Sequence, residues 1–465
     1  MTQSFSGKDL IAMGFAPARW FGQALATANA EGLDQAGLRA LAADLAARET
    51  RQIPLQEGPA VARFIAPETA AETANAEAVF ETMDALVRTP TVVFASIMPD
   101  ACPAGPVGTI PVGGVVSTRN ALHPGMHSAD VCCSLMATDI GDVDPAGVLD
   151  AAHALCHFGP GGRRDPVDTL PGDLEARIRA NPFYTDDVAL PYARHHLRTV
   201  GASNHFVFVG RSEATGRVHL VTHHGSRGFG AHLYKSGMKS AEAFRRKHAP
   251  DTLKQNAWIE ADSQDGADYW DALEIAHDWT YLNHASLHAA VLSALGASGH
   301  GRLFSPHNFV FRDPEARDVF HHAKGATPVA PAMLRDPHDT MIIPMNMVEP
   351  VLLVRPGARN RTGFAPHGAG RVMTRTAHRK RHEGLSEDEL VARETGGIDA
   401  RFYCGIPDTS ELPSAYKSAA SVQRDMAAFG LADVVDRVMP FGCIMAGDVE
   451  RNAPWRRAGT KTRTP

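Results

Sequence analysis

Two apolar runs lie close together in the sequence, at residues 203–211 (SNHFVFVGR) and 216–230 (GRVHLVTHHGSRGFG). Their β-branched and aromatic residues are typical of strands, and the short interval between the runs predicts that the two strands are neighbours. The second run ends in a glycine-bearing turn. Histidines stand at the strand ends, at His205 and His223. The chain is therefore expected to contain a sheet whose strand ends present imidazoles.

Other periodic segments predict helices as well as strands. Residues 33–50 and 69–88 are rich in Ala and Leu with apolar positions at helical spacing, and residues 266–297 form a longer helical stretch. Strand character is found at 90–99 and 339–357, and residues 421–442 are expected to be a helix that runs into a closing strand. The sequence has no internal repeat and no low-complexity linker. We therefore expect one intertwined α+β domain, although the length of 465 residues also permits two or three domains.

Composition limits the class of protein. Apolar residues make up 44% of the chain and charged residues 21%, as is usual for a folded globular protein. The sequence contains no apolar run long enough to span a membrane, and its first residues lack a signal-peptide pattern. We therefore expect a cytoplasmic protein that does not associate with membranes.

Histidine and charge point to specific chemistry. The chain has 23 histidines, which makes metal binding or phosphate handling worth testing, although most of them are expected to be ordinary surface residues. Its six cysteines are too few and too scattered for a disulfide scaffold. The net charge of −6 argues against polyanion binding by the whole surface, so nucleic acid would have to bind local basic patches. Two such patches occur, at residues 371–382 and 451–465.

Four separate segments place potential metal ligands at turns. The donors are a carboxylate, a thiolate and imidazoles, a set that suits Zn²⁺, Mn²⁺, Fe²⁺ or Co²⁺ better than Ca²⁺. No pair of them has a zinc-finger or HExxH interval, and any one segment alone could be a hydrogen-bonded turn or a buried thiol. The candidates are Asp130 and Cys133, Asn204 and His205, His223, and His307 with Asn308.

A fifth segment, residues 364–382 (FAPHGAGRVMTRTAHRKRH), places His367 before three small residues and a basic run. Small residues allow backbone N–H groups to approach a phosphate, and arginine holds phosphate oxygens in bidentate fashion. Taken alone, the segment could equally be a solvated basic loop.

Taken together and in order, these segments resemble the RtcB family of GTP-dependent RNA-splicing ligases, which join a 3′-phosphate or 2′,3′-cyclic phosphate end to a 5′-hydroxyl end. The motifs that carry the resemblance are MPDACPAGPVG, DVCC, SNHF, HHGSRGFG, PHNF, AKGATP, PHGAGRVMTR and ELPSAYKS. The resemblance implies a single large α+β domain with mixed sheets around a central metal- and nucleotide-binding cleft. We assign residues 90–447 to this domain, residues 1–89 to an N-terminal helical segment that is part of it or appended to it, and residues 448–465 to a basic tail.

The resemblance implies a site with two Mn²⁺ ions. Cys133 would bridge both ions, Asp130 and His205 would complete one, and His223 and His307 the other. Cys133 is preferred to Cys132 because it keeps the three-residue step from Asp130. His223 is preferred to His224 by its register against the Gly-Ser-Arg-Gly turn, and His224 is expected to be exposed or to lie behind the ligands.

The resemblance also implies that His367 attacks the α-phosphate of GTP and forms a histidine–GMP adduct. Backbone groups of Gly368, Ala369 and Gly370 would approach the nucleotide. Phosphate-binding roles fall on Asn204, Arg227, Asn308, Arg371 and Arg375, and Tyr416 would pack on the base or sugar. Asp100 would help to form the wall of the site, or would be a salt-bridged structural residue.

Five positions depart from the family pattern. Cys102 replaces a histidine, and Cys132 and Ser134 replace two glycines. Phe208 stands where the family usually has an acidic residue, and Ala446 where it has a lysine. In the family these last two residues lie near the guanine nucleotide, so the identity of the nucleotide is left open.

The expected activity is RNA ligation in tRNA splicing or RNA repair, with GTP and Mn²⁺. The resemblance leaves room for an accessory activating protein as a further partner. Two alternatives are a dinuclear-metal phosphoesterase or cyclic phosphodiesterase that lacks nucleotide transfer, and a non-catalytic RNA-binding paralog. Retention of His367, Arg371 and Arg375 together argues against both alternatives.

Overall fold

The computed structural model describes residues 4–184 and 187–451. The helices are α1 (Gly7–Ala12), α2 (Phe21–Glu31), α3 (Gln35–Thr50), α4 (Ala70–Leu86), α5 (Pro145–Leu155), α6 (Gly172–Ala180), α7 (Ala189–His195), α8 (Arg227–His248), α9 (Gln264–Leu295), α10 (Arg375–Arg381), α11 (Glu387–Thr395) and α12 (Ala419–Ala428). None of the helices in these two ranges is both long and apolar enough to cross a membrane.

The strands form two larger sheets and two small ones. The strands are β1 (Val61–Arg63), β2 (Val92–Cys102), β3 (Val112–Arg119), β4 (Ala121–Leu122), β5 (Ser134–Gly141), β6 (Phe206–Ser212), β7 (Val218–His224), β8 (Ile259–Glu260), β9 (Gly301–Pro306), β10 (Asn308–Arg312), β11 (Val319–Lys324), β12 (Ala326–Pro328), β13 (Met341–Ile343), β14 (Val351–Pro356), β15 (Phe364–Pro366), β16 (Asp399–Phe402) and β17 (Ala432–Met445). One sheet has the order β1-β2-β3-β11-β10, and the other has the order β13-β14-β17-β6-β7-β5-β9, with β16 paired to β17. Pairs β12-β15 and β4-β8 complete the set. The expected α+β class is confirmed.

Most of the predicted elements are present. The neighbouring strands are β6 and β7, which pair antiparallel with Phe206 opposite His223. The predicted helices 33–50, 69–88 and 266–297 correspond to α3, α4 and α9. The predicted strand 339–357 is instead divided into β13 and β14, because Pro344 and Pro350 lack the N–H that a strand ladder requires.

The longest helix, α9, supports the strands that carry the site. Its N-cap, Ser263, accepts a hydrogen bond from Gly266 N–H, and Gly296 ends it in the left-handed conformation, with φ of 61°. His284 and His288 of α9 bond to hydroxyl groups on β5 and β7, where Thr222 contacts both rings at 2.7 and 2.8 Å. These bonds fix β5 and β7 against the helix, and so set the strand ends beside which the predicted ligands lie.

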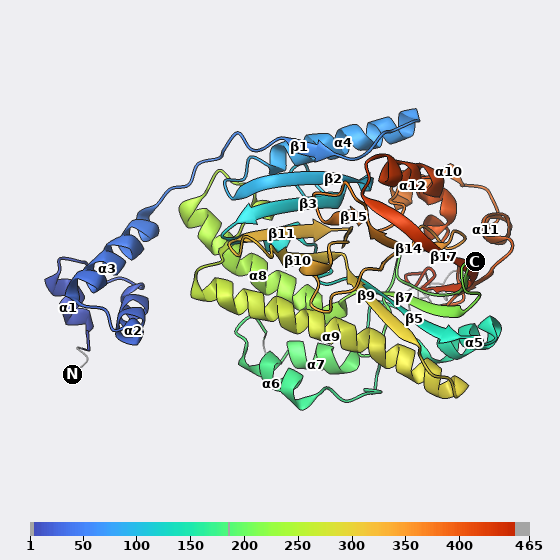
Figure 1. The fold of residues 1–465 in the computed structure, drawn as a ribbon, viewed down its shortest axis with the longest axis horizontal. Coiled ribbons are helices and arrows are strands. Elements are labelled where there is room, and N and C mark those ends of the chain that lie inside the picture. Colours follow the sequence, from blue (N-terminus) through green and yellow to red (C-terminus); the bar gives the residue numbers. More distant parts are fainter. Residues whose placement is uncertain (1–3, 185–186, 452–465) are drawn as a thin grey trace, which may run out of the picture.

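The N-terminal helices have a core of their own. Trp20, Leu38 and Leu45 are among the buried residues that α1–α3 share, and Figure 1 shows these helices set apart from the sheets. By contrast, α4 packs through Val79 and Met83 on the sheet that contains β2. The division at residues 89 and 447 stays a prediction, and most of the predicted tail lies outside the described residues.

Candidate functional site

A cavity of about 430 Å³ opens between the two larger sheets. His307 marks the junction, because it separates β9 of one sheet from β10 of the other. The cavity lining brings together these predicted site residues: Asp130, Cys133, Asn204, His205, His223, His307, Asn308, His367, Gly368, Ala369, Gly370, Arg371, Arg375 and Tyr416. Arg227 and Asp100, which the sequence also assigns to the site, lie outside the lining.

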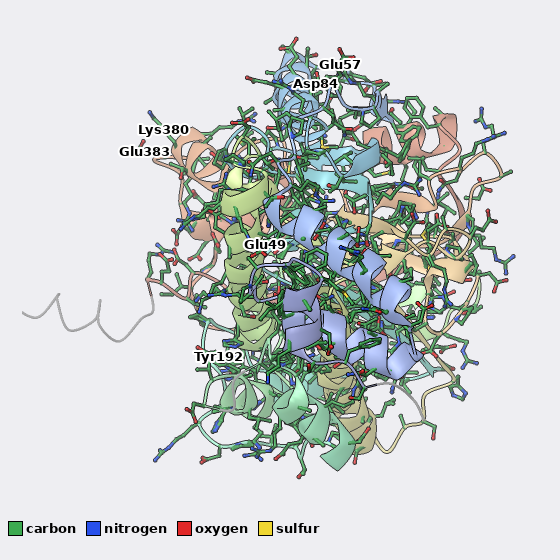
Figure 2. All side chains as sticks on the ribbon, turned by 90° about the vertical axis from the view of Figure 1, so that its left-hand side faces the viewer. Glu49, Glu57, Asp84, Tyr192, Lys380 and Glu383 are labelled. Atoms are coloured by element: carbon green, nitrogen blue, oxygen red, sulfur yellow. The ribbon has the colours of Figure 1, made fainter. Side chains whose placement is uncertain are left out.

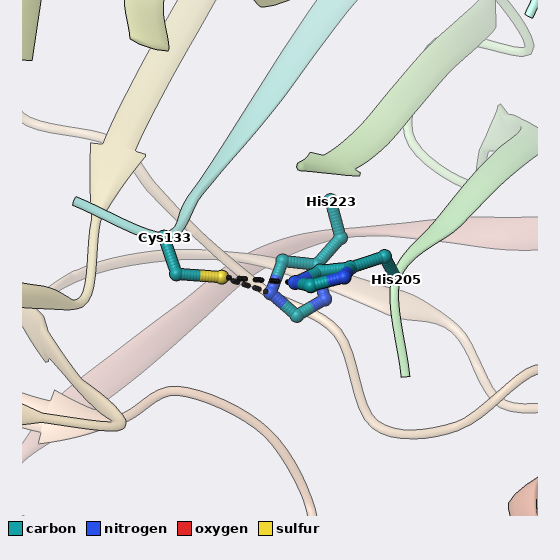
Figure 3. Close-up of side chains that lie close together, drawn as sticks. All are labelled: Cys133, His205 and His223. Carbon is teal, nitrogen blue, oxygen red and sulfur yellow. Dashed lines mark hydrogen bonds between the residues drawn. The ribbon is translucent and has the colours of Figure 1, made fainter. Parts of the chain in front are cut away.

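Cys133, His205 and His223 form a compact buried donor cluster (Figure 3). Their ligand atoms all lie within 4.8 Å of one another. The Sγ of Cys133 is 3.4 Å from Nε2 of His205 and 3.1 Å from Nε2 of His223. Cys133 directly precedes β5, His205 directly precedes β6, and His223 lies near the end of β7. Three strands of one sheet thus deliver the three donors to one point.

Asp130 and His307 extend this cluster on opposite sides. The Oδ2 of Asp130 is 3.1 Å from Nε2 of His205, and Nε2 of His223 is 3.2 Å from Nε2 of His307. Asp130 and His307 thus flank the Cys133–His205–His223 cluster. The division of these five donors between two ions stays a prediction.

The choice between adjacent residues is clear in the structure. Cys132 is fully buried in the core and does not line the cavity, whereas Cys133 does. His224 is also fully buried, with its ring stacked on His284 at 3.9 Å between centroids. The expectation that His224 is exposed is therefore wrong: the ring lies in the core against α9. The alternation of side chains along β7 sends His223 and His224 to opposite faces.

The turns around the cluster adopt left-handed backbone conformations. Cys132 and Ser203 have φ of 64° and 66°, a region that residues with a side chain enter at a cost of about 1 kcal/mol or more. At Gly225 an added Cβ would lie 2.6 Å from the His205 ring, so only glycine allows the chain to pass there. Backbone strain is thus concentrated beside the donors, as it often is at functional sites.

The protonation of the donors fits metal binding. Burial lowers the pKa of His223 and of His307 well below the usual histidine value, so both rings are neutral at pH 7. His223 Nδ1 donates to the Asn204 carbonyl at 3.2 Å, which leaves Nε2 free to act as a ligand. Burial opposes ionisation of Asp130, but hydrogen bonds from His205 and Ser226 outweigh it and lower the pKa of the carboxyl group. Nδ1 of His205 and of His307 is buried without a partner.

Asp100 holds His367 in one orientation. Its Oδ2 accepts hydrogen bonds from Nδ1 of His367 at 2.6 Å and from the backbone N–H of the same residue at 3.1 Å. Nε2 of His367 is therefore the nitrogen left for chemistry. The ring lies 4.9 Å from the His307 ring, between centroids, and so borders the donor cluster.

The small residues after His367 allow the chain to pack closely against β2, in addition to leaving room for a phosphate to approach the backbone. Gly370 has φ of 70°, and an added Cβ there would lie 1.8 Å from the Asp100 carbonyl oxygen. Glycine is therefore required for the 367–371 turn to rest on β2. That contact places His367 within reach of the Asp100 carboxylate.

A buried carboxylate organises the basic wall of the cavity. Arg371 Nη1 donates to Glu411 Oε2 at 3.1 Å, and Arg375 Nε donates to Glu411 Oε1 at 2.7 Å. Tyr416 also donates its hydroxyl to Glu411. The Glu411 side chain is only 1% exposed. The predicted phosphate-binding arginines are thus fixed in place by a residue that the ELPSAYKS motif contains but that sequence reasoning did not single out.

The other predicted phosphate-binding residues differ in position. Arg227 donates to Thr199 Oγ1 and to the Gly159 carbonyl, so its guanidinium group is directed away from the cavity. Asn308 bridges two loops, because it accepts from Gly325 N–H at 2.8 Å and contacts the carbonyl of Asp130 at 3.4 Å.

The basic run after His367 continues along α10 to the molecular surface. Figure 2 shows Lys380 and Glu383 at one edge of the molecule. Arg379 pairs with Asp408 at 2.9 Å, which reduces the net charge of this patch. The second basic patch falls almost wholly on residues outside the described part of the chain.

Lys324 is a further cavity residue that sequence reasoning missed. It ends β11, donates to the Ile110 carbonyl at 3.0 Å, and lines the cavity. Burial lowers its pKa to about 8. A lysine held inside a cavity at such a cost is more consistent with ligand binding than with fold stability. A lysine at the end of an apolar strand was the available signal.

Replacing Lys324 by methionine is expected to stabilise the free protein at pH 7 by at most about 3 kcal/mol. Below pH 8 the lysine is protonated in both folded and unfolded states, so the full cost of its burial is present. Above pH 8 the folded protein loses the proton first, and the wild type gains stability until about pH 10.5. Urea unfolding of both proteins at several pH values should therefore show that the difference in their free energies of unfolding becomes smaller as the pH rises. A difference in these free energies that does not change with pH would contradict the lowered pKa of Lys324.

Fold and site together define a protein with a thiol–imidazole–carboxylate donor set beside a histidine held by an aspartate. A family model described as tRNA-splicing ligase RtcB matches residues 175–446, more than half of the chain. The chain belongs to the RtcB family, as a divergent member.

Individual relatives agree with this assignment. The chain is 25% identical over 327 residues to a tRNA-splicing ligase RtcB of Thermococcus kodakarensis, covering 62% of this chain and 64% of the relative. It is 27% identical over 347 residues to that of Pyrococcus furiosus, covering 66% and 35%. It is 25% identical over 370 residues to RNA-splicing ligase RtcB of Escherichia coli, covering 72% and 86%. The chain thus spans less than two thirds of the length of the two archaeal relatives.

Proposed function

We propose that the protein is an RNA ligase that joins 3′-phosphate or 2′,3′-cyclic phosphate ends to 5′-hydroxyl ends through a histidine–nucleotide intermediate. The names of its relatives, which are tRNA- and RNA-splicing ligases, support tRNA splicing as the setting, and RNA repair is the other proposed setting. The nucleotide implied by the family resemblance is GTP. The proposal includes two divalent cations, with Mn²⁺ as the expected ion.

The position of His367 supports this activity most directly. Its Nε2 is unencumbered because Asp100 holds Nδ1, and its ring borders the donor cluster at 4.9 Å from His307. A neutral imidazole with one nitrogen held as a donor presents a lone pair on the other nitrogen. The arginines fixed by Glu411 line the same cavity and can hold phosphate oxygens.

The reaction proceeds in three transfers at phosphorus. Nε2 of His367 attacks the α-phosphorus, forms a P–N bond, and releases pyrophosphate. An oxygen of the RNA 3′-phosphate then attacks the same phosphorus, which breaks the P–N bond and frees the imidazole. The 5′-hydroxyl of the second RNA end attacks the activated 3′-phosphate, loses its proton and displaces the nucleoside monophosphate. A 2′,3′-cyclic end must first be opened by water.

Asp130, Cys133, His205, His223 and His307 are the residues that would hold the cations. Bound cations would supply Lewis-acid polarisation of the phosphate oxygens. Asp100 would keep His367 in the required tautomer and orientation throughout, because its carboxylate stabilises the imidazole as positive charge develops. Arg371 and Arg375 would orient the phosphates for in-line attack.

Covalent labelling tests the proposed activity. Protein incubated with Mn²⁺ and α-labelled GTP, ATP, CTP or UTP in turn should acquire an acid-labile label with at least one nucleotide. RNA carrying a 3′-phosphate and a 5′-hydroxyl should then release that label as nucleoside monophosphate and become joined. A protein that opens cyclic phosphates but takes no label from any of the four nucleotides would contradict the ligase and favour the phosphoesterase alternative.

A further inference from the structure

One end of the cavity is apolar and rich in sulfur. Strands β6 and β17 pair with Phe206 opposite Met445 and Phe208 opposite Cys443, and all four residues line the cavity. Phe208 and Cys443 are each 2% exposed. We call these four residues the apolar wall.

The loop between β13 and β14 adjoins the apolar wall, because Met347 packs in one cluster with Phe206, Cys443 and Met445. The loop contributes Met345, Asn346 and Met347 to the cavity lining. Oδ1 of Asn346 already accepts hydrogen bonds from the backbone N–H groups of Val348 and Glu349, at 3.0 and 3.1 Å. The amide group of Asn346 can therefore offer a ligand a donor, but its acceptor is occupied.

The carboxylates that line the cavity are also occupied. Asp130 bonds to His205 and Ser226, and Glu411 bonds to Arg371, Arg375 and Tyr416. Sulfur is a weak acceptor, so Cys443 and the methionines cannot replace a carboxylate. Ala446 is fully buried and packs with Ile444 and Val207 in a separate core cluster, outside the cavity lining.

Guanine and adenine place different demands on such a surface. Guanine carries adjacent N–H donors at N1 and N2, and burying them without acceptors is costly. Adenine carries one exocyclic amino group beside ring nitrogens that accept hydrogen bonds. A donor such as the Asn346 side-chain N–H can bond to one of these ring nitrogens. Both purines gain from apolar and sulfur contacts with their rings.

From these features we infer that the apolar wall receives the purine base without selecting guanine, so that the protein accepts ATP at least as well as GTP. This inference rests on the proposed function, because that function brings a nucleotide into the cavity with its α-phosphate at His367. The remaining space for the nucleoside is then the end of the cavity lined by Phe206, Phe208, Met347, Cys443 and Met445.

Equilibrium binding tests the inference without requiring catalysis. The α,β-methylene analogues of ATP and GTP carry a bridge that cannot be cleaved at the α-phosphorus, so calorimetry with the Mn²⁺-loaded wild type reports binding alone. The ATP analogue should bind as tightly as the GTP analogue or more tightly. A preference for the GTP analogue of about tenfold or more would overturn the inference. Hydrogen bonds from the protein to the N–H groups of guanine would favour the GTP analogue by about this factor. Failure of both analogues to bind would overturn it too.

Variants of the wall supply a second test. Phe208→Glu places an acceptor beside the base and should shift the binding ratio toward the GTP analogue by about tenfold. Phe208→Leu is the matched control and should leave the ratio unchanged. Because a buried glutamate can prevent folding, Met347→Gln provides an acceptor of similar size to the native side chain, and thermal melts identify folded variants. No shift in any folded acceptor variant would place the base elsewhere and overturn the inference.

The two proposals fail in different ways. Absence of covalent label from all four nucleotides, with analogue binding intact, would reject the ligase mechanism and leave the binding ratio to decide base selectivity. Labelling with GTP alone, together with a strong preference for its analogue, would support the ligase and reject the inference.

Discussion

Protein with His367 replaced by alanine is expected to acquire no nucleotide label, a loss of at least about 1,000-fold in labelling rate. Alanine offers no lone pair for attack on the α-phosphorus, and the other cavity histidines cannot substitute. His205, His223 and His307 direct Nε2 into the donor cluster, where a bound cation would occupy it. The measurement is the time course of acid-labile label under saturating nucleotide and Mn²⁺.

A matched control comes from the same basic segment. His382 lies just after α10, contacts Ser414, and does not line the cavity. His382→Ala should therefore label at the wild-type rate. Mn²⁺ binding should survive in His367→Ala, because His367 bonds to Asp100 rather than to the donor cluster. Undiminished labelling of the His367→Ala protein would assign the nucleophile to another residue.

Replacing Cys133 by alanine is expected to weaken Mn²⁺ binding by about 100-fold or more. Its sulfur contacts one histidine of each proposed ion, at 3.1 Å from Nε2 of His223 and 3.4 Å from Nε2 of His205. Without it, each ion would lose a ligand and the charge that separates the two cations. The measurement is calorimetric titration of metal-free protein with Mn²⁺, followed by metal analysis after dialysis.

The pH dependence of this binding gives an independent readout. Burial raises the pKa of the Cys133 thiol well above its ordinary value when no cation is bound. Metal binding must therefore release the thiol proton, and the affinity of the wild type should rise about tenfold for each unit of pH between about 6 and 8. Cys133→Ala should lose this dependence, whereas Cys132→Ala, which alters a buried core thiol beside it, should retain both the affinity and the slope. Equal losses of Mn²⁺ affinity in Cys133→Ala and Cys132→Ala would contradict the assignment of Cys133 as the bridging ligand.

Local sequence patterns predicted the elements well where a segment determines its own conformation. The pairing of β6 with β7 followed from two apolar runs with a short interval, and α9 corresponds to the long helical stretch predicted at 266–297. The exception, residues 339–357, shows how two prolines divide an apolar stretch into separate strands. Strands and helices of this kind depend on residues that are close in the sequence, so they can be predicted from the sequence.

Groups whose role depends on partners far along the chain were harder to foresee. Glu411 and Lys324 lie within the ELPSAYKS and AKGATP motifs. Their roles appear only when the basic wall and the cavity are assembled. Arg227 follows the His223 turn in sequence, but its guanidinium group is held by a distant carbonyl instead of facing the cavity. His224 differs from His223 only in the face of β7 on which it lies.

By itself, the sequence determined the chemistry available to this protein: which donors occur, in what order, and which histidine precedes a run of small and basic residues. The tertiary structure alone decided that donors from residues 130 to 307 meet within a few ångströms, that Asp100 holds His367, and that Phe206, Phe208, Cys443 and Met445 give the cavity an apolar wall. The physical reason is that strand register and the packing of two sheets set these distances. Neither is encoded by the spacing of residues within any one segment.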